Sequence, residues 1–568
     1  MTASLGEQLK ARRSPEGIWR GALSSSAIST SVSVFALRLI DRERYGKQIE
    51  AGEQWLLRTM RADGVWGDSI ESPPNMTATL LSYASLYASG APPPKTRAFL
   101  AATFGGMTDE RIIAGVLACY GKDLTFSAPV LVMCALAGVI KSWNDIPQLP
   151  FELSLLPQRF FRFLQLPVVS YAIPALIAVG ILRHRKGKKT WLCGLRELFA
   201  GKSLKVLEKL QPVNGGFLEA APLTAFVAMC LCGAGCRDHP VTRQAGRFLL
   251  ETVRPDGAWP IDTDLACWVT ALGVKALKGD VPDRALLLEK IKSAAFAFKH
   301  PFTGARPGGW GWSDLPGAAP DADDTAGNLV ALHILQDGKG CPEAERGVQW
   351  LLDLQNRDGG MPTFCKGWGK LPFDRSSPDL SAHSLTAFEL WHDSLPETLQ
   401  RRCAKSKVRL LRWMKKTQAA DGSWIPLWFG DQDAPDGHSP VYGTAVAVEH
   451  LCHSRHPLAQ EISAKGTGYL LSAQNADGGW GGSKGLPSKV TLTARTLSAL
   501  AVSPDTDREA IGRGVAFLYG HFKANTLLRP EPVGLYFARL WYSEELYNLT
   551  FTLTALNHIR AIHAEEQV

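Results

Sequence analysis

One recurring stretch decides the fold, and its fullest copy is Tyr469-Leu470-Leu471-Ser472-Ala473-Gln474-Asn475-Ala476-Asp477-Gly478-Gly479-Trp480-Gly481. An apolar helical end is followed by Asp-Gly, which suits a turn, and then by an aromatic ring. One such turn alone would be an ordinary helix end, but five full copies argue against coincidence. Because such helices cannot bury their apolar faces singly, we expect them to stack into an array or a closed ring. The other turns, the last of them a looser copy, are Asp63-Gly64-Val65-Trp66, Asp256-Gly257-Ala258-Trp259, Asp358-Gly359-Gly360, Asp421-Gly422-Ser423-Trp424 and Gly215-Gly216-Phe217.

Length and periodicity favour an all-α chain. Its 568 residues leave room for two domains of ordinary size. Apolar residues recur at helical spacing in segments such as 265–277, 325–335 and 381–390, and no alternating strand pattern stands out. The sequence therefore predicts a helical protein of two domains.

An acidic cluster, Asp321-Ala322-Asp323-Asp324-Thr325-Ala326, is the strongest catalytic signal. Three carboxylates within four positions cannot all ionise if the segment is buried, because repulsion and desolvation raise at least one pKa. Such a cluster is a candidate Brønsted acid. Taken alone, the same tetrad would more often be a solvated turn or a calcium loop, and the repeats around it favour the acid.

With both features, the chain resembles the squalene-hopene cyclase family of class II terpene cyclases over nearly its whole length. The repeats resemble the Gln-Trp motifs of that family, and the acidic cluster resembles its Asp-x-Asp-Asp-Thr-Ala motif. The resemblance implies two α/α barrels of the α6-α6 type around a large apolar cavity. It also implies an N-terminal segment, 1–19, packed on the catalytic barrel, a second barrel domain with a membrane-facing region at 20–258, and a catalytic barrel at 259–568.

The resemblance assigns roles at the acid end. It makes Asp323 the proton donor, supported by His383, which Asp379 supports in turn. A cationic His383 bound to one carboxylate would help to place the remaining proton where it is most acidic. The rest of the implied catalytic set comprises two flanking carboxyls and the first residue of an Asp-Thr pair, which are Asp321, Asp324 and Asp262.

Aromatic rings would line the cavity, because a desolvated ring face stabilises a cation by up to about 2 kcal/mol. Without the resemblance, each ring would be interpreted as core packing. The rings that the resemblance places at the substrate are Trp312, Trp310, Phe364, Trp428, Tyr171, Tyr536, Trp541 and Tyr542.

Several positions depart from the family pattern at the end of the cavity where cyclisation terminates. The segment 29–33 and Leu81 lack the glutamates that often order water there, and Ile261 replaces an aromatic neighbour of Asp262. We therefore expect a hopene-like skeleton by default, and alkene products in preference to alcohols.

The sequence offers no support for other catalytic classes. It contains no serine-histidine-acid signature, P-loop, dinucleotide glycine pattern or Asp-Asp-x-x-Asp metal motif. Its eleven cysteines are scattered, and Cys230, Cys232 and Cys236 with His239 make a poor metal set on an apolar helix. We expect no metal and no cofactor.

The basic run Arg183-His184-Arg185-Lys186-Gly187-Lys188-Lys189 carries much of the net charge of +8. It is a solvated loop or a segment attracted to an anionic bilayer; nucleic-acid binding is disfavoured because no recognition module accompanies it. The preceding apolar run, 163–182, is interrupted by two prolines and suits a buried helix better than a membrane span. With no secretory signal in 1–15, we expect a monotopic protein on the cytoplasmic face of the bacterial inner membrane. Its expected partners are an apolar, squalene-like substrate and membrane lipid, and we also consider a homodimer.

Three interpretations stay open. The first is an isomerase that cyclises squalene or a similar linear polyprene. The second is a class II cyclase of a prenyl diphosphate, of the copalyl-diphosphate type, which shares the acid motif. The third is a non-enzymatic or transferase relative of the α/α barrel, which would not need the acidic cluster.

Overall fold

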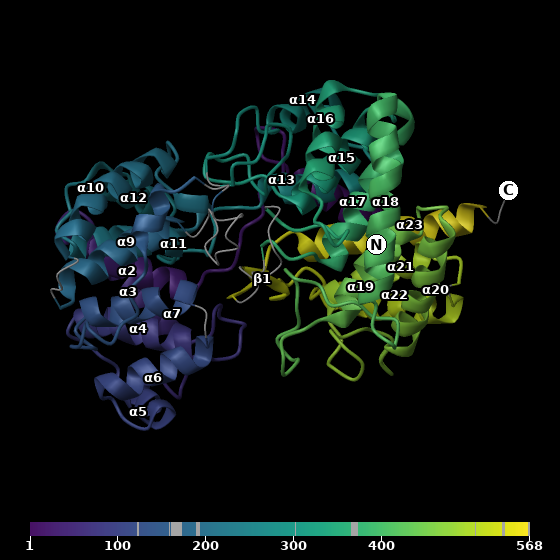
Figure 1. Cartoon of the computed structure of the whole chain (residues 1–568). Coiled ribbons are helices and arrows are strands. Elements are labelled where there is room, and N and C mark those ends of the chain that lie inside the picture. Colours follow the sequence, from purple (N-terminus) through teal and green to yellow (C-terminus); the bar gives the residue numbers. More distant parts are fainter. Residues whose placement is uncertain are drawn as a thin grey trace. The chain divides into compact units, whose positions relative to one another are not determined.

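Helices make up most of the computed structural model, which confirms the all-α prediction (Figure 1). The structure describes residues 1–121, 124–157, 160, 173–188, 193–301, 303–364, 373–505, 507–536 and 540–565. These divide into two compact units, of which the first comprises 1–22, 264–314 and 318–568, and the second comprises 23–263 and 315–317.

The first unit is a closed ring of inner helices surrounded by outer helices. Each inner helix contacts the next in the order α13, α15, α17, α19, α21 and α23, and α23 contacts α13 to close the ring. The inner helices are α13 (Ala266–Ala276), α15 (Ala322–Leu335), α17 (Pro378–Trp391), α19 (Pro440–Leu451), α21 (Val490–Val502) and α23 (Tyr547–Glu565). The outer elements are α1 (Thr2–Ala11), α14 (Arg284–Ser293), α16 (Pro342–Leu354), η4 (His392–Ser394), α18 (Glu397–Thr417), α20 (Pro457–Ser472) and α22 (Arg508–Lys523). A ribbon of two antiparallel strands, β1 (Gly534–Tyr536) and β2 (Leu540–Tyr542), precedes α23.

The second unit follows the same principle. Its described inner helices form a ring of contacts in the order α2, α4, α7, α9 and α11, and α11 returns to α2. Its helices are α2 (Ala27–Asp41), α3 (Gly46–Thr59), α4 (Met76–Ala88), α5 (Pro94–Phe104), α6 (Asp109–Tyr120), α7 (Leu124–Leu136), η1 (Phe151–Leu155), α9 (Ile173–Lys186), α10 (Cys193–Leu210), η3 (Phe217–Glu219), α11 (Ala221–Gly233) and α12 (Pro240–Glu251). Among the described residues, no helix is both long and apolar enough to cross a membrane.

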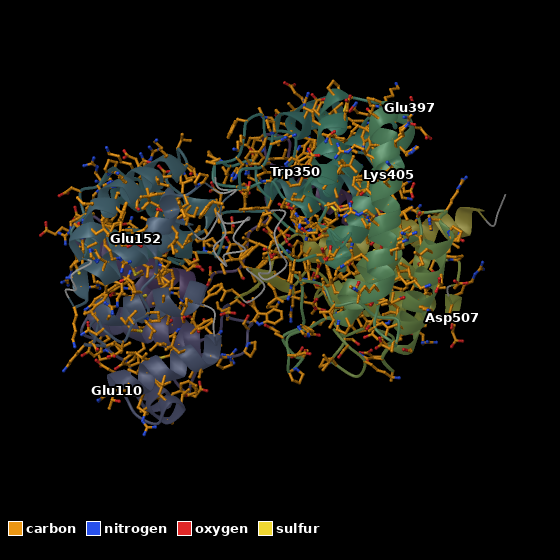
Figure 2. The ribbon with its side chains drawn as sticks, viewed as in Figure 1. Glu110, Glu152, Trp350, Glu397, Lys405 and Asp507 are labelled. Carbon is orange, nitrogen blue, oxygen red and sulfur yellow. The ribbon has the colours of Figure 1, made fainter. Side chains whose placement is uncertain are left out.

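The division into inner and outer helices follows from the distribution of apolar residues. Inner helices are buried on all sides and mostly lack charge, as α21 shows from Val490 through Ala501, where Arg495 is the charged residue. Outer helices are amphipathic and carry their charges outward, as Glu397 and Lys405 of α18 show (Figure 2).

The repeated turn connects each outer helix to the next inner helix through the tryptophan. The Trp480 indole N–H donates to the Leu470 carbonyl at the end of α20, at 2.7 Å, and its backbone N–H donates to Thr493 Oγ1 in α21, at 3.0 Å. The indole therefore caps one helix while the peptide group fixes the next. Tryptophans with the same pair of bonds are Trp19, Trp66, Trp259, Trp310 and Trp424.

The glutamine of the turn adds a second connection, to the following outer helix. Gln474 Nε2 donates to the carbonyl of Gly478 in its own turn and to that of Ala510 in α22, both at 2.8 Å. Gly478 has φ of 85°, and a Cβ there would lie 2.6 Å from the Arg513 carbonyl oxygen, so the turn requires glycine. Glutamines that make the equivalent pair of bonds are Gln211, Gln355 and Gln418.

We predict that Gln355→Ala lowers the free energy of unfolding by about 1–3 kcal/mol, because it leaves the buried carbonyls of Gly359 and Ser406 without their donor. Gln54 is the control: it is exposed, and its side chain bonds only to Glu50 in its own helix. Urea unfolding followed by circular dichroism measures both variants. Equal effects of Gln355→Ala and Gln54→Ala would contradict the stabilising role of the glutamine.

Candidate active site

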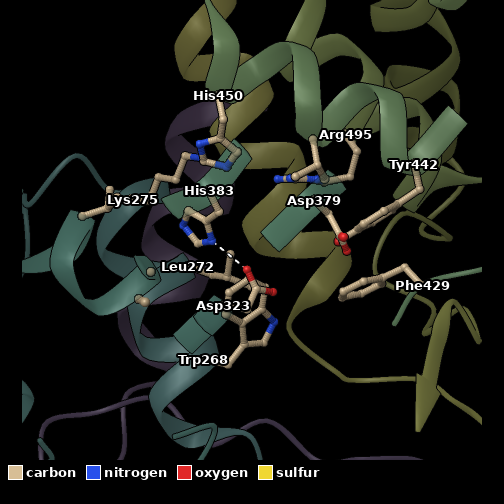
Figure 3. A pocket seen from close by; sticks show the side chains of 14 residues that line it. Trp268, Leu272, Lys275, Asp323, Asp379, His383, Phe429, Tyr442, His450 and Arg495 are labelled. Atoms are coloured by element: carbon tan, nitrogen blue, oxygen red, sulfur yellow. Dashed lines mark hydrogen bonds and ion pairs between the residues drawn. The ribbon is translucent and has the colours of Figure 1, made fainter. Parts of the chain in front are cut away.

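A pocket opens inside the ring of the first unit, and five of its inner helices, α13, α15, α17, α19 and α21, bring the acid and its neighbours together (Figure 3). Asp323 comes from α15, Asp379 and His383 from α17, and Tyr442 from α19. The remaining residues that line it are Trp268, Ala271, Leu272, Lys275, Gly327, Val330, Phe429, Val446, His450 and Arg495.

The acidic cluster forms the start of α15. Asp321 is the N-cap residue, and its Oδ1 accepts a hydrogen bond from the Asp324 backbone N–H at 2.8 Å. Burial raises the pKa of Asp321 to about 7. Burial and the adjacent Asp321 charge raise the pKa of Asp324 well above its usual range. Near neutral pH, Asp324 therefore favours its protonated form and Asp321 is protonated in part.

Asp323 is the carboxyl of the cluster that reaches the pocket. Its side chain is 23% exposed, whereas Asp321 and Asp324 are buried. Its Oδ1 lies 2.7 Å from Nδ1 of His383, the interaction drawn as a dashed line in Figure 3. The structure thus brings together the donor and the histidine that the sequence predicts.

Asp379 is placed one helical turn before His383 but bonds elsewhere. Its Oδ1 accepts a hydrogen bond from Ser377 Oγ, and no hydrogen bond joins Asp379 to His383 in the described part of the chain. Burial, followed by the charge of Asp323, raises the pKa of Asp379 to about 6. In place of the predicted contact with His383, the structure gives Asp379 a hydrogen bond with Ser377, the N-cap residue of α17.

A second set of polar residues, which the sequence analysis missed, extends the pocket. The ring of His450 lies 4.6 Å from the ring of His383, centroid to centroid. Lys275 and Arg495 both form ion pairs with the fully buried Glu449, at 2.6 Å and 3.3 Å. The only sign of them in the sequence is a charged or imidazole side chain on an otherwise apolar inner helix.

Three aromatic side chains of the pocket were also missed. Phe429 and Tyr442 stack at 4.2 Å between ring centroids, and Trp268 meets the His383 ring edge-on at 6.1 Å. Phe429 directly follows the predicted Trp428, and the stretch Trp428-Phe429-Gly430 was the available signal.

Three of the predicted substrate rings form a separate cluster in the first unit. Phe364 lies edge-on to Trp312 at 5.8 Å and to Trp428 at 6.1 Å, and Phe373 completes the cluster at 6.0 Å from Phe364. Trp312, Phe364 and Trp428 are each half-buried, so part of each ring is accessible.

None of the other predicted residues that the structure describes is among those that line the pocket. Trp310 is fully buried and occupies the tryptophan position of a repeated turn, so it packs between helices and does not face the pocket. Asp262 is buried in the second unit. Tyr171 lies outside the described residues. The residues of the ribbon are the half-buried Tyr536 and Trp541 and the buried Tyr542, whose hydroxyl lies 3.3 Å from that of Tyr547.

The described residues contain no group of three or more His, Cys, Asp or Glu side chains that could hold a metal ion. Cys230 is buried on α11, and burial raises the pKa of its thiol. Such a thiol packs as a small apolar side chain.

Comparisons with known proteins agree with one another. The model of the squalene-hopene cyclase C-terminal domain matches residues 267–561, and the model of the N-terminal domain matches residues 3–122. A probable squalene–hopene cyclase of Sinorhizobium fredii is 25% identical over 91% of this chain and 89% of its own length. Enfumafungin synthase of Hormonema carpetanum is 24% identical over 93% of this chain, which spans only 45% of that relative. The solved ent-copalyl diphosphate synthase from Streptomyces platensis shares the fold, with a TM-score of 0.57 and 17% identity over 98% of this chain and 99% of its own.

The raised pKa of Asp379, about 6, predicts a pH dependence of stability. At a pH between the ordinary pKa of an aspartate and 6, the folded protein holds a proton on Asp379 that the unfolded chain has lost. Binding of this proton stabilises the folded protein at low pH, and the stabilisation is lost as the pH rises towards 6 and above.

Asp379→Asn should remove this pH dependence, which changes the free energy of unfolding by on the order of 1 kcal/mol per pH unit. The stability of the variant relative to wild type should therefore rise between pH 4 and pH 7. Urea unfolding midpoints at half-unit intervals measure the difference, and a difference that does not change with pH would contradict the assignment.

Proposed function

The chain belongs to the squalene-hopene cyclase family, and we propose that it cyclises squalene or a similar linear polyprene by protonating a terminal alkene. The observation that carries the proposal is the Asp323 carboxyl. It is 2.7 Å from His383, next to two carboxyls whose pKa values are raised, in a pocket lined by aromatic rings.

The first step would be a proton transfer from Asp323 to an alkene carbon. The O–H bond of the carboxyl breaks, the new C–H bond takes the alkene π electrons, and a tertiary carbocation remains on the neighbouring carbon. A hydrogen bond from His383 Nδ1 to Oδ1 stabilises the carboxylate that is left behind, which strengthens the acid. The neighbouring Asp324 favours its neutral form, so it adds little negative charge that would hold the proton back.

Ring closure would then depend on the aromatic residues. Each closure moves the positive charge to a new carbon, and an aromatic face nearby stabilises it by up to about 2 kcal/mol when water is excluded. Phe429, Tyr442 and Trp268 serve the first cation in the pocket. The half-buried rings of Trp312, Phe364 and Trp428 serve later ones. The last cation loses a proton, which gives a hopene-like alkene.

A prenyl diphosphate is the second candidate substrate, favoured by the basic end of α9, Arg183 to Lys186. In such a substrate, the diphosphate and the protonated alkene are at opposite ends of the chain. Lys275 and Arg495 share the pocket of Asp323, so they are at the alkene end of such a substrate and not at the diphosphate end. Both cations are also already paired with Glu449.

The decisive experiment incubates the protein with squalene and, separately, with geranylgeranyl diphosphate, and identifies the products by mass spectrometry. We expect a cyclised product from squalene, and Asp323→Asn should reduce its rate by far more than tenfold, which would correspond to about 1.4 kcal/mol. The exposed Asp393→Asn is the control. Cyclisation of the diphosphate alone would favour the second candidate, and an active Asp323→Asn enzyme would place the proton donor elsewhere.

We also propose that the protein works at a membrane surface, because so apolar a substrate must enter from lipid. The support lies in α10, where Leu195 and Leu198 are 52% and 70% exposed on one face of the helix. The exposed Lys186 ends α9 in the same unit, and a basic residue near an anionic bilayer is worth about 1 kcal/mol. We propose the cytoplasmic face of the bacterial inner membrane as its location.

Replacing both Leu195 and Leu198 by Glu should weaken binding to phosphatidylglycerol vesicles at least tenfold in a co-sedimentation assay, because it removes apolar contact and adds negative charge. Leu57→Glu is the matched control, since Leu57 is 45% exposed on α3 in the same unit. A wild-type protein that stays in the supernatant at low salt would argue against membrane use.

A further inference from the structure

Helix α18 carries a large excess of positive charge on the outer surface of the first unit (Figure 2). Its apolar residues, such as Leu410 and Trp413, are buried. Glu397 is the only acidic residue among its 21 positions. Cations therefore dominate the solvent face of this helix. The basic residues of α18 are Arg401, Arg402, Lys405, Lys407, Arg409, Arg412, Lys415 and Lys416.

Five of these basic residues form one continuous row, which we call the α18 stripe. Its members are Arg401, Lys405, Arg409, Arg412 and Lys416, and all five are exposed. They follow one another at steps of three or four residues, which return to the same side of a helix. Since a helix rises about 1.5 Å per residue, the stripe is about 22 Å long.

The stripe destabilises the helix that carries it. Like charges three or four residues apart repel each other, and protein surfaces normally intersperse charges of both signs. The first member, Arg401, is offset by Glu397 four residues earlier. The other members have no such neighbour, because α18 contains no second acidic residue. The repulsion along the rest of the stripe is therefore uncompensated within the helix.

The carboxylates of neighbouring helices pair with the flanks of α18 and not with the stripe. One carboxylate each from α16, α17 and α20 forms an ion pair with a basic residue beside the stripe. These pairs are Asp353–Arg402 at 2.8 Å, Glu389–Lys407 at 2.7 Å and Glu461–Lys415 at 2.9 Å.

Three members of the stripe are left without a partner. Arg409 donates to the Asn356 carbonyl at 2.7 Å, so its guanidinium is held by the turn that precedes α17. Lys405, Arg412 and Lys416 form no hydrogen bond or ion pair with any residue that the structure describes. Their charges are therefore available to an anionic partner.

The chemistry of the stripe favours an acidic protein segment as that partner. A helix that lies in a bilayer surface inserts apolar side chains, and none of the large apolar side chains exposed in the described part of the chain belongs to α18. Proteins that bind single-stranded nucleic acid add aromatic rings that stack on bases, and the one ring of α18, Trp413, is buried. A helix with carboxylates every three or four residues would meet the cations along their whole length, as oppositely charged positions do between paired helices.

We propose that the α18 stripe docks an acidic helix of a partner protein. Carboxylates of the partner would pair with Lys405, Arg412 and Lys416 and relieve the repulsion along the stripe. Because these side chains are exposed, the contact would be reversible and weakened by salt. No residue of α18 lines the pocket of Asp323, so docking is independent of the proposed function.

A fluorescein-labelled peptide of five Glu-Ala-Ala-Ala repeats is the probe, because alanine favours a helix and the glutamates recur every four residues. Fluorescence anisotropy at about 50 mM salt measures its binding, which about 200 mM salt should weaken. The triple replacement Lys405→Glu, Arg412→Glu and Lys416→Glu should weaken binding at least about tenfold, which corresponds to about 1.4 kcal/mol. Since the three side chains are exposed, the variant should keep the circular dichroism and melting temperature of wild type.

The matched control places the same change of net charge on another helix. Lys202, Lys205 and Lys209 are exposed on α10, and their joint replacement by Glu should leave peptide binding as tight as in wild type. A second peptide of the same composition, with its glutamates in one block, should bind more weakly than the repeat peptide, because its carboxylates no longer match the stripe.

Absence of peptide binding would overturn the docking site, and so would equal losses in the two triple variants, which would be an effect of net charge alone. Equal binding of the two peptides would overturn the helical partner. A DNA duplex or phosphatidylglycerol vesicles that bind more tightly than the peptide, and lose binding in the α18 variant, would replace the acidic helix by nucleic acid or lipid.

Discussion

The structure of the catalytic unit depends on the hydrogen bonds of the tryptophan in its repeated turns, a position that Met361 takes in the turn before α17. The indole N–H caps the end of an outer helix, and the peptide N–H of the same residue binds a hydroxyl in the next inner helix. Because the pattern repeats around the ring, the inner helices begin close to the same end of the barrel. Trp268, Asp323, Asp379 and Tyr442 all lie within the first three residues of their helices. Their convergence on one pocket therefore follows from the turn and not from local sequence around any one of them.

The same convergence creates the acid. Helix N-termini present free backbone N–H groups, which favour a carboxylate, yet burial of Asp321, Asp324 and Asp379 outweighs that stabilisation and raises their pKa values. Asp323 differs from them in its partial exposure and its contact with His383. The environment thus distinguishes the partly exposed Asp323 from three buried carboxyls whose pKa values are raised.

The sequence predicts the features that are local or repeated. The turns indicated a ring of helices, and the acidic cluster indicated buried carboxyls with raised pKa values, because both depend on neighbours in the chain. Trp310 shows what the sequence could not decide. The stretch Gly308-Gly309-Trp310-Gly311-Trp312 has two tryptophan rings, and only the hydrogen bond to Thr325 identifies Trp310 as the one that belongs to a turn. His450, Glu449 and Arg495 were missed for the same reason. Each looks like an isolated polar residue in an apolar helix until the ring brings α13, α17, α19 and α21 together.

These buried polar groups also bear on how a carbocation enzyme can remain active. A dry aromatic pocket protects the cation, but dryness isolates the acid from the water that must recharge it. The imidazoles and the Lys275–Glu449–Arg495 ion pairs lie inside the barrel around the acid, and the Trp312 ring cluster adjoins them, because the Trp268 N–H of the pocket donates to the Trp312 carbonyl. The aromatic residues could change with the product while the acid stayed the same. On this view the acid end defines the reaction class, and the skeleton formed depends on the rings that the later cations meet.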